Sequence, residues 1–290
     1  MPVFHLDNLD DRRLDPYRSL KTTNLTRDQG LFIAEGRRVV ERLFASDFRV
    51  HSVLLSDRKE SEIRPVVPLD TPTYVLPHAL ARRLVGYNFH TGVLACGYRK
   101  RHPTLPAAVE DVTAESLLVG CPDVTDPENL GTIIRLCAAF GADALLLGRA
   151  CCDPFSRRVL RVSMGNAFFL PIVTCDDLTD TLSHYRRKHC YELVATVLDG
   201  SAEALEAASR SRRMLLLFGN EATGLSRSYL ELADRRITIP MHGPIDSLNV
   251  AVAAGIFLYH FTRYAANPHA DANRPPAPKE SSVEPPPAPS

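Results

Sequence analysis

The second half of the chain alternates short, almost continuous apolar runs with longer segments of helical periodicity, from residue 116 to about residue 265. Apolar runs between helices are typical of strands buried on both faces, so the pattern predicts an α/β fold with a parallel sheet covered by helices. The predicted strands are 116–124, 144–148, 170–175, 192–198, 213–219 and 235–240, and the predicted helices are 130–141, 154–166, 177–189, 201–208, 227–233 and 247–265. Ligands of such sheets bind beyond the carboxyl ends of the strands, so the polar residues that follow each strand are candidates for a site.

A smaller α/β arrangement precedes this sheet. Its predicted elements are helices over 30–46 and 78–86 and strands over 50–56, 72–77 and 91–99. Residues 98–116 combine basic residues with two prolines and show no periodicity, which favours a linker. We therefore predict one domain over 1–104 and a second over 105–265. Residues 266–290 are rich in Pro, Ala and charge with little to bury, which predicts a disordered tail.

Composition excludes several classes of protein. The 34 basic and 34 acidic residues balance, so a nucleic-acid partner has to be met by a local patch. The seven cysteines are odd in number and form no CxxC pair, which favours reduced thiols over disulfides or a zinc site and predicts a cytoplasmic protein without a metal. The sequence shows neither an export signal nor an apolar run of about 18 residues, so we expect no membrane span.

The first candidate loop is "DVTDPENLGTIIRLCAAFGA" (123–142), where a predicted strand ends before a helix. Asn129 is a suitable N-cap for that helix, and this local role accounts for it. Arg135 is not explained in this way, because it lies on a helix that otherwise looks buried. We expect Arg135 to bind an anion or orient a substrate, with an internal salt bridge as the alternative.

Two further loops follow predicted strands. In "LLLFGNEATGLS" (215–226), two glycines around Glu221 permit a tight turn whose backbone faces a ligand, although the loop matches neither common nucleotide-binding fingerprint. In "IPMHGPIDSLNVAVAAGIFLYH" (239–260), Gly243 and Pro244 are suited to a turn, and Ser247 is suited to cap a helix that begins at Leu248. Capping leaves Asn249 unexplained.

Taken in order, these three loops resemble the motifs of the SpoU/TrmH-type RNA 2'-O-ribose methyltransferases of the SPOUT superfamily. The segment "RVSMGNAFFLPI" (161–172) is similar to the family as well. The first domain, through "GLFIAEGRRVVERLFAS", resembles the small α/β ribosomal-protein-like domain with which many members bind substrate. The resemblance implies a parallel-sheet SPOUT domain with a C-terminal trefoil knot, a topology that general chain rules disfavour.

The resemblance also implies a cofactor, S-adenosyl-L-methionine, and the residues that serve it. Carried over by position, the cofactor-binding residues are Phe218, Gly219, Ile239, Met241 and Leu248, and the catalytic residues are Arg135, Asn129, Glu221, Ser247 and Asn249. The implied reaction is in-line methylation of a ribose 2'-hydroxyl in ribosomal or transfer RNA, in which positioning contributes much of the rate. Because a guanidinium only donates hydrogen bonds, we expect Arg135 to hold a phosphate or polarise the hydroxyl rather than act as a base.

The resemblance further implies a homodimer packed through the knot region. The apolar stretch "VAVAAGIFLY" fits such a contact through its small residues Ala251, Ala253, Ala254 and Gly255, and an ordinary buried helix explains it equally. Arg157, Arg158 and Arg161 lie on one side of a predicted helix and are candidates to bind RNA, with a solvated basic face as the alternative. The same alternative applies to the arginines of segment 30–46. Ala251 stands where members often have Ser, which should leave activity intact.

Two other functions remain possible from sequence alone. A non-catalytic RNA-binding or assembly factor would keep the same fold and the same motifs. A nucleotide-dependent oxidoreductase is disfavoured, because the glycine fingerprint of dinucleotide sites is missing.

Overall fold

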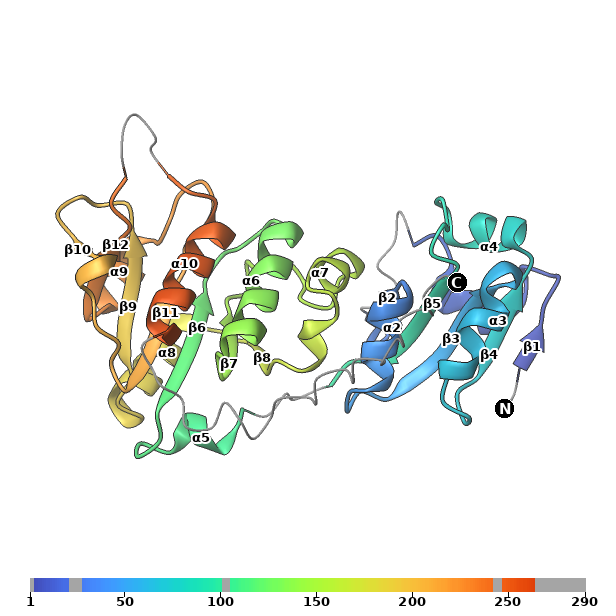
Figure 1. Ribbon diagram of the computed structural model, residues 1–290, viewed down its shortest axis with the longest axis horizontal. Helices are drawn as coiled ribbons and strands as arrows, with labels where there is room; N and C mark the ends of the chain where they lie inside the picture. The colour runs from blue at the N-terminus through green and yellow to red at the C-terminus, as the bar shows by residue number, and fades with distance from the viewer. Residues whose placement is uncertain (1–2, 21–27, 101–104, 242–246, 264–290) are drawn as a thin grey trace, which may run out of the picture.

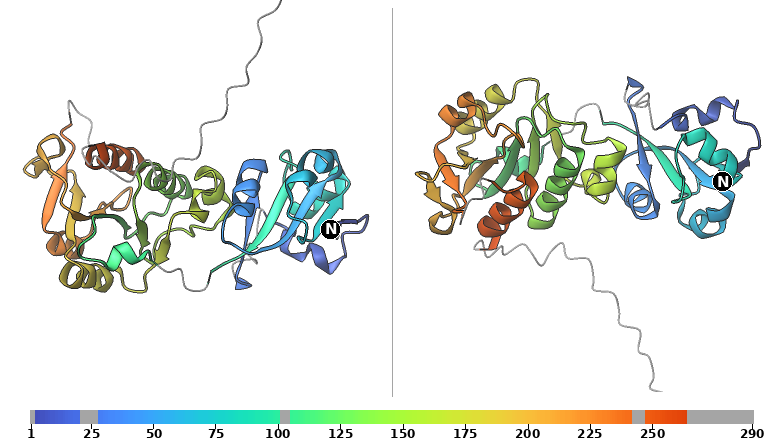
Figure 2. Two further views of the ribbon diagram at one scale, coloured as in Figure 1. Left: turned by 60° about the horizontal axis from the view of Figure 1, so that its bottom comes forward. Right: turned by 90° about the horizontal axis from the view of Figure 1, so that it is seen from above.

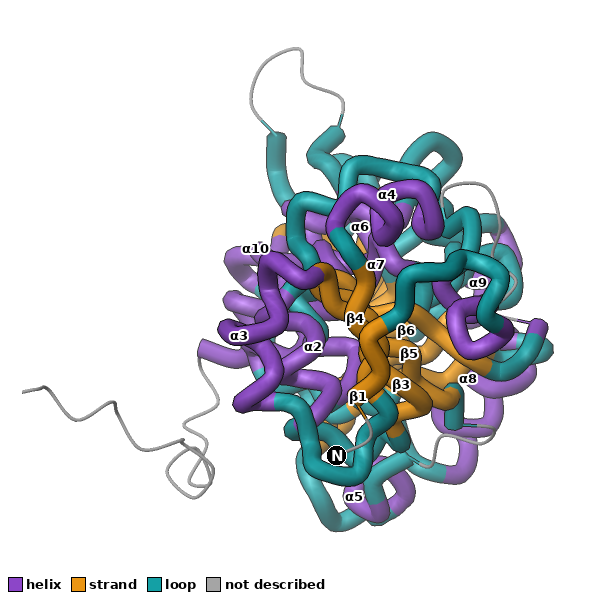
Figure 3. The backbone as a smooth tube through the Cα atoms, turned by 90° about the vertical axis from the view of Figure 1, so that its right-hand side faces the viewer, coloured by secondary structure: helices purple, strands orange, loops and turns teal. Residues whose placement is uncertain are grey.

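The computed structural model describes residues 3–20, 28–100, 105–241 and 247–263 of the 290-residue chain, and these form two β-sheets side by side along the molecule (Figure 1). The first sheet ends at Tyr98 and the second begins at Ser116, on either side of the predicted boundary. Viewed along the long axis, helices lie on both sides of the strands (Figure 3). The predicted tail over 266–290 lies outside the described residues. Within the described part, none of the helices has the length and hydropathy to cross a membrane.

The first sheet has five strands in the described residues, in the order β1-β4-β3-β5-β2. They are β1 (Val3–His5), β2 (Leu31–Glu35), β3 (Val50–Ser56), β4 (Thr73–Leu76) and β5 (Val93–Tyr98). β3 pairs parallel with β4 and antiparallel with β5. Helices α2 (Arg37–Phe44) and α4 (His78–Val85) pack on opposite faces, and the short α3 (Glu60–Ile63) lies on the α2 side. This part of the chain therefore forms one sheet with helices on both faces.

The predicted helix over 30–46 is wrong in its first half. Leu31–Glu35 form β2 with every residue buried, and the helix begins only at Arg37. Between them Gly36 has a φ of +89°, a conformation that glycine adopts without the cost a side chain would impose. Gly36 thus lets the chain leave the strand and enter the helix directly, a change that the apolar pattern did not reveal.

The second sheet has seven strands in the described residues, in the order β10-β12-β9-β11-β6-β7-β8, and every pair is parallel. They are β6 (Ser116–Cys121), β7 (Ala144–Leu147), β8 (Ile172–Thr174), β9 (Glu192–Val197), β10 (Glu203–Ala204), β11 (Arg213–Leu217) and β12 (Arg235–Thr238). The predicted parallel sheet is confirmed. The predicted helix over 201–208 is wrong, because Glu203 pairs with β12 and its carboxylate accepts a hydrogen bond from Arg235 at 2.7 Å.

Helices cover both faces of this sheet (Figures 1 and 2). α6 (Pro127–Phe140), α7 (Arg157–Val162) and α10 (Val250–Arg263) lie on one face, and α5 (Ala107–Glu110), α8 (Leu178–Lys188) and α9 (Arg227–Leu232) lie on the other. Successive strand residues therefore enter different cores: Leu117 and Val119 join the core under α6, whereas Leu118 joins the core under α8. This double burial explains why the strands read as continuous apolar runs.

A cluster of aromatic rings joins the two domains. Phe32 and Phe48 of the first domain pack against Phe155 and Phe168 of the second, with ring centroids between 5.4 and 5.6 Å apart. Ring pairs at this separation are attractive beyond the area that they bury. The core under α6 consequently continues into the core under α2 without interruption.

Ion pairs surround these rings. Arg99 donates two hydrogen bonds to the carboxylate of Asp153, at 2.8 and 2.6 Å. Arg157 lies 3.3 Å from the carboxylate of Glu35, whose side chain is only 2% exposed, and its guanidinium stacks 4.1 Å over the ring of Tyr87. Burial, followed by the charge of Glu35, raises the pKa of Tyr87. The two domains are thus held together by polar as well as apolar contacts.

Candidate active site

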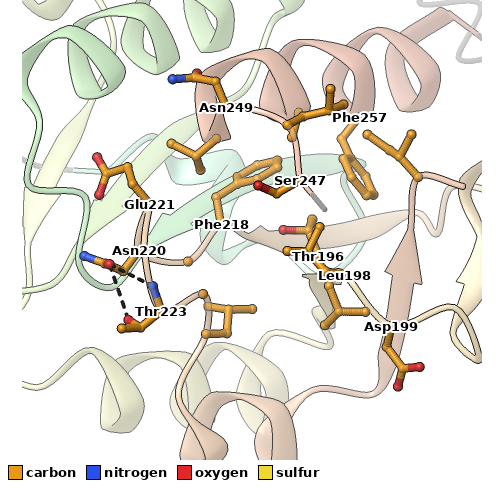
Figure 4. A pocket seen from close by; sticks show the side chains of 18 of the residues that line it. Thr196, Leu198, Asp199, Phe218, Asn220, Glu221, Thr223, Ser247, Asn249 and Phe257 are labelled. Carbon is orange, nitrogen blue, oxygen red and sulfur yellow. Dashed lines mark hydrogen bonds between the residues drawn. The ribbon is translucent and has the colours of Figure 1, made fainter. Parts of the chain in front are cut away.

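A cavity of about 610 Å³ lies at the carboxyl ends of β9, β11 and β12, where a parallel sheet is expected to hold its ligand. All five residues predicted to bind the cofactor line it: Phe218, Gly219, Ile239, Met241 and Leu248. Glu221, Ser247 and Asn249 of the predicted catalytic set line it too (Figure 4). The second and third sequence motifs therefore meet at one site. Gly243 and Pro244, predicted to make a turn there, lie outside the described residues.

Three further lining residues were not selected from the sequence. Thr196 is in β9, and Leu198 and Asp199 directly follow that strand (Figure 4). Leu198 is 67% exposed, an unusual position for a large apolar side chain unless it contacts a ligand or partner. The rule that polar residues after a strand are site candidates points to Asp199, which follows the predicted strand 192–198, but not to the apolar Leu198.

The loop after β11 is a closed turn. The backbone N–H of Asn220 donates to Gly224 at 3.0 Å, and that of Gly224 donates back to Asn220 at 2.9 Å. The Asn220 side chain accepts from the backbone N–H of Ala222 and donates to the carbonyl of Asp123, at 2.9 and 3.0 Å. Gly219 is required here, because a Cβ on it would lie 2.3 Å from the Gly224 backbone. The tight turn expected from the two glycines is therefore present.

A chain of hydrogen bonds connects all three motifs. The Asn129 amide nitrogen donates to the carboxylate of Glu221 at 3.0 Å, and its oxygen accepts from the amide nitrogen of Asn249 at 2.8 Å. The Glu221 carboxylate also accepts from the backbone N–H groups of Asp126 and Thr125, at 3.2 and 3.4 Å. One carboxylate and two amides thus fix the relative positions of the loops at the edge of the cavity.

These contacts set the ionisation of Glu221. Partial burial raises the pKa of its carboxyl group, but hydrogen bonds from Asn129 and from backbone N–H groups outweigh that effect. The net pKa lies below the usual glutamate value, so Glu221 is ionised at neutral pH. A carboxylate in this state accepts hydrogen bonds and donates none.

The predicted caps of two helices are wrong. α6 begins at Pro127, and its N-cap is Asp126, whose carboxylate accepts from the N–H of Glu128 at 2.8 Å; Asn129 lies inside the helix, with its side chain turned to Glu221. α10 begins at Val250 rather than Leu248. Its first N–H groups are satisfied by Asn249, whose oxygen accepts from Ala251 at 2.9 Å, so Ser247 is not the cap.

Arg135 lies apart from this network. It is exposed on α6, and no acidic or other hydrogen-bonding partner for it is present in the described part of the chain. The alternative of an internal salt bridge is therefore not realised among these residues. Arg135 and Asn129 do not line the cavity of their own chain, in contrast to the other three residues of the predicted catalytic set.

The three arginines of α7 have different surroundings. Arg157 is turned to Glu35 of the first domain, and Arg158 pairs with Glu128 on α6. Arg161 is exposed and has no acidic partner in the described residues. Only Arg161 therefore stands free on the surface that the sequence predicted for RNA.

Comparison with known proteins identifies the family. Residues 116–259 match the SpoU rRNA Methylase family. An "uncharacterized tRNA/rRNA methyltransferase" of Mycobacterium bovis is 35% identical over 88% of this chain and 90% of the relative. The 23S rRNA (guanosine-2'-O-)-methyltransferase RlmB of Acinetobacter baylyi is 30% identical over 72% of this chain and 87% of the relative. The crystal structure of an AdoMet-bound rRNA methyltransferase from Sinorhizobium meliloti is 26% identical, with a TM-score of 0.76, and the match covers 91% of this chain and 99% of that one.

The parallel sheet, the cavity at its carboxyl edge and these matches define an RNA methyltransferase. The chain belongs to the SpoU rRNA methylase family. The resemblance inferred from the three motifs is confirmed.

Proposed function

We propose that this protein transfers the methyl group of S-adenosylmethionine to a ribose 2'-hydroxyl of ribosomal RNA. The observation that carries the proposal is the convergence of the predicted cofactor residues on one cavity, beside the linked groups of Glu221, Asn129 and Asn249. Family membership supports the same reaction, and the RlmB relative is named for guanosine 2'-O-methylation of 23S rRNA. Transfer RNA is the second candidate substrate.

The cavity suits the cofactor in size and in chemistry. Its volume of about 610 Å³ lies within the range of about 300–1,000 Å³ typical of small-molecule sites. Phe218, Ile239 and Leu248 offer apolar surface, while Glu221 and Asp199 place carboxylates on the wall, which suits a ligand that carries positive charge. When bound, S-adenosylmethionine supplies an activated methyl group on a sulfonium centre.

The residues of the chain serve mainly to position the reactants. Asn129, Glu221 and Asn249 hold the loops in register, and the hydroxyl of Ser247 faces the cavity from the third motif (Figure 4). Arg135 holds a phosphate next to the target ribose or polarises its hydroxyl, and the proton passes to phosphate or water. Because the geometry is fixed, the cofactor and the ribose react as if they were parts of one molecule.

The site is completed by a second copy of the chain in this proposal. α10 presents an exposed apolar face made of Val252, Ile256 and Tyr259, which are 53%, 39% and 52% exposed. Exposed apolar groups at this spacing on one helix favour a partner. Arg135 lies on the neighbouring α6, so a subunit packed on this face brings Arg135 toward the cavity of its partner.

The dimer surface in this proposal lies on larger side chains of α10 rather than on its small residues. Ala251 and Ala254 are buried within their own subunit, and Gly255 packs near Leu136 of the same chain. The small residues therefore let α10 approach α6 closely, and the more exposed side chains of Val252 and Ile256 are offered to the partner in this proposal. A C-terminal trefoil knot in the SPOUT domain and a cytoplasmic location belong to the same proposal.

Cofactor binding and methyl transfer test the proposal directly. Calorimetry should detect S-adenosylmethionine binding, and the protein should transfer tritiated methyl groups to ribosomal RNA from cells that lack the gene. Arg135→Ala should abolish transfer while cofactor binding persists. A protein that binds no S-adenosylmethionine is not this enzyme, and unchanged transfer by Arg135→Ala would refute the role of Arg135.

The alternative of a non-catalytic assembly factor predicts a different result. Such a factor would support growth equally well with Arg135→Ala or with the wild-type residue. The retained cavity and the names of the relatives favour the enzyme.

A further inference from the structure

Exposed arginines gather where the helices of the two domains meet. Arg38 and Arg42 on α2 and Arg161 on α7 are exposed, and none of them has an acidic partner in the described part of the chain. Two other surface arginines are paired with acids: Arg37 contacts Glu41 at 2.7 Å, and Arg227 contacts Glu231 at 2.7 Å. The charge balance of the whole chain therefore hides a local excess of positive charge.

Arg38 and Arg42 lie on one flank of α2. Val39, Val40 and Leu43 form its buried face, and residues four apart share a flank. That flank is turned to the second domain, because Arg42 donates to the carbonyl oxygen of Met164 at 2.8 Å.

Gly165 makes this approach possible. A Cβ on Gly165 would lie 3.3 Å from the Cβ of Arg42, closer than ordinary van der Waals contact, and its φ is +77°. Arg42 therefore lies against the end of α7 because no side chain intervenes.

Arg161 continues this row on α7. It lies three residues before Met164, the residue that Arg42 contacts. Arg157 and Arg158 of the same helix are turned to opposite sides, toward the first domain and toward α6, which leaves Arg161 pointing outward between them. α7 packs on α6, the helix of Arg135, and α10, α6, α7 and then the first domain follow one another across the molecule (Figures 1 and 2).

Positive charges brought together without acids repel one another, and a polyanion with regularly spaced charges relieves that repulsion. We propose that Arg38, Arg42 and Arg161 form one arginine track that binds successive phosphates of the RNA backbone and leads from the first domain across α7 toward Arg135. The inference rests on the proposed function, because it takes RNA as the substrate. Because the track contacts the phosphates of the RNA and not its bases, it positions the RNA without selecting the nucleotide.

The salt dependence of RNA binding tests the track. A fluorescein-labelled RNA hairpin is titrated with the full-length protein at several KCl concentrations and followed by fluorescence anisotropy. The variant Arg38→Ala/Arg42→Ala/Arg161→Ala should bind about tenfold more weakly. The slope of log affinity against log salt should fall by about 2 to 3, since each of the three lost phosphate contacts removes about 0.7 to 0.9.

The matched control removes the same charge elsewhere. Arg58→Ala/Arg82→Ala/Arg83→Ala takes three exposed arginines from other surfaces of the first domain, and the slope should stay at the wild-type value. The charge-conserving variant Arg38→Lys/Arg42→Lys/Arg161→Lys should retain most of the slope, which separates loss of charge from loss of fold.

The outcomes distinguish the track from the enzyme. The arginine track is overturned if the track variant keeps the wild-type slope, or if the control variant loses as much slope as the track variant. Neither result affects the proposed methyl transfer. A wild-type protein without affinity for the hairpin overturns the track as well. Failure of the wild-type protein to bind S-adenosylmethionine refutes the proposed function independently, because the three arginines do not line the cavity.

Discussion

The amide of Asn129 donates a 3.0 Å hydrogen bond to the carboxylate of Glu221, although 92 residues separate them in the chain. The bond joins the first turn of α6 to the loop after β11, and Asn249 extends it to the start of α10. The hydrogen bonds of both asparagine side chains go to other groups of the protein, so the two residues help to shape the edge of the cavity.

Replacing Asn129 should remove a hydrogen bond from the carboxylate of Glu221 and change the pKa of that group. In Asn129→Ala the carboxylate loses the side-chain bond that lowers its pKa, so its pKa should rise toward the usual value. We expect carbon-detected NMR titration of the Glu221 carboxyl to show this rise, and kcat for methyl transfer to fall by up to about 100-fold as the loops lose register. Asn88→Ala, an exposed residue in the first domain, should change neither quantity.

The same shift predicts how pH affects the site. The pKa of Glu221 is lower in the folded protein than in the unfolded chain, so its stabilising contribution is present above the unfolded pKa and is lost as pH falls through the folded pKa. The wild-type protein should therefore lose stability at acid pH more steeply than Asn129→Ala. Parallel losses in the two proteins would contradict the contact.

Arg157 should act in stability rather than in RNA binding. Arg157→Ala leaves the carboxylate of Glu35 buried without its partner, which should lower the free energy of unfolding by about 2 to 4 kcal/mol in urea denaturation. Arg158→Ala is the matched control on the same helix. Its pair with Glu128 is half-exposed, so the loss should stay below about 1 kcal/mol.

The RNA affinity of the same variants decides between the two roles of Arg157. If it binds phosphate, Arg157→Ala should reduce the salt slope of hairpin binding; if it joins the domains, the slope should match the wild type. The second result is expected, because the guanidinium is held between Glu35 and Tyr87.

Gly219→Ala should close the cavity to its ligand. The new Cβ would lie 2.3 Å from the backbone of Gly224, so the turn that forms the wall must move. Calorimetry should show loss of S-adenosylmethionine binding, while circular dichroism confirms that the protein remains folded. Gly200→Ala is the control in the loop after β9, where nothing lies within 4 Å of an added Cβ, and it should bind as the wild type does.

The sequence predicted best what local patterns determine. The parallel sheet follows from apolar runs between helices, and the rule that ligands bind beyond strand ends pointed to the loop of Glu221, which lines the cavity. The cofactor residues with apolar side chains were reached only through the family resemblance. Periodicity gives no reason to assign Ile239 or Met241 to a polar ligand.

The errors have a common physical cause, which is competition from distant partners. Asn129 and Asp126 are both good N-caps, and the sequence does not reveal that Glu221 engages Asn129 while Asp126 caps the helix. The sequence did not distinguish Arg157 from Arg158 and Arg161, and only the fold shows that Glu35 lies opposite Arg157. In each case a residue far away in the sequence determines which contact the side chain makes. Local propensity carries no information about such a partner.

Cysteine reactivity gives a final test of the fold. All seven cysteines are described and none is in a disulfide, and only Cys190 is exposed. Burial raises the pKa of the Cys137 thiol to about 12 and that of Cys151 to about 11, so both remain protonated and unreactive at pH 8. Iodoacetamide at pH 8 should therefore modify one thiol quickly in the folded protein, and mass spectrometry should locate it at Cys190. Cys190→Ser should remove the fast phase, while urea should expose the remaining thiols; rapid modification of Cys137 in the native protein would contradict the burial of α6 against the sheet.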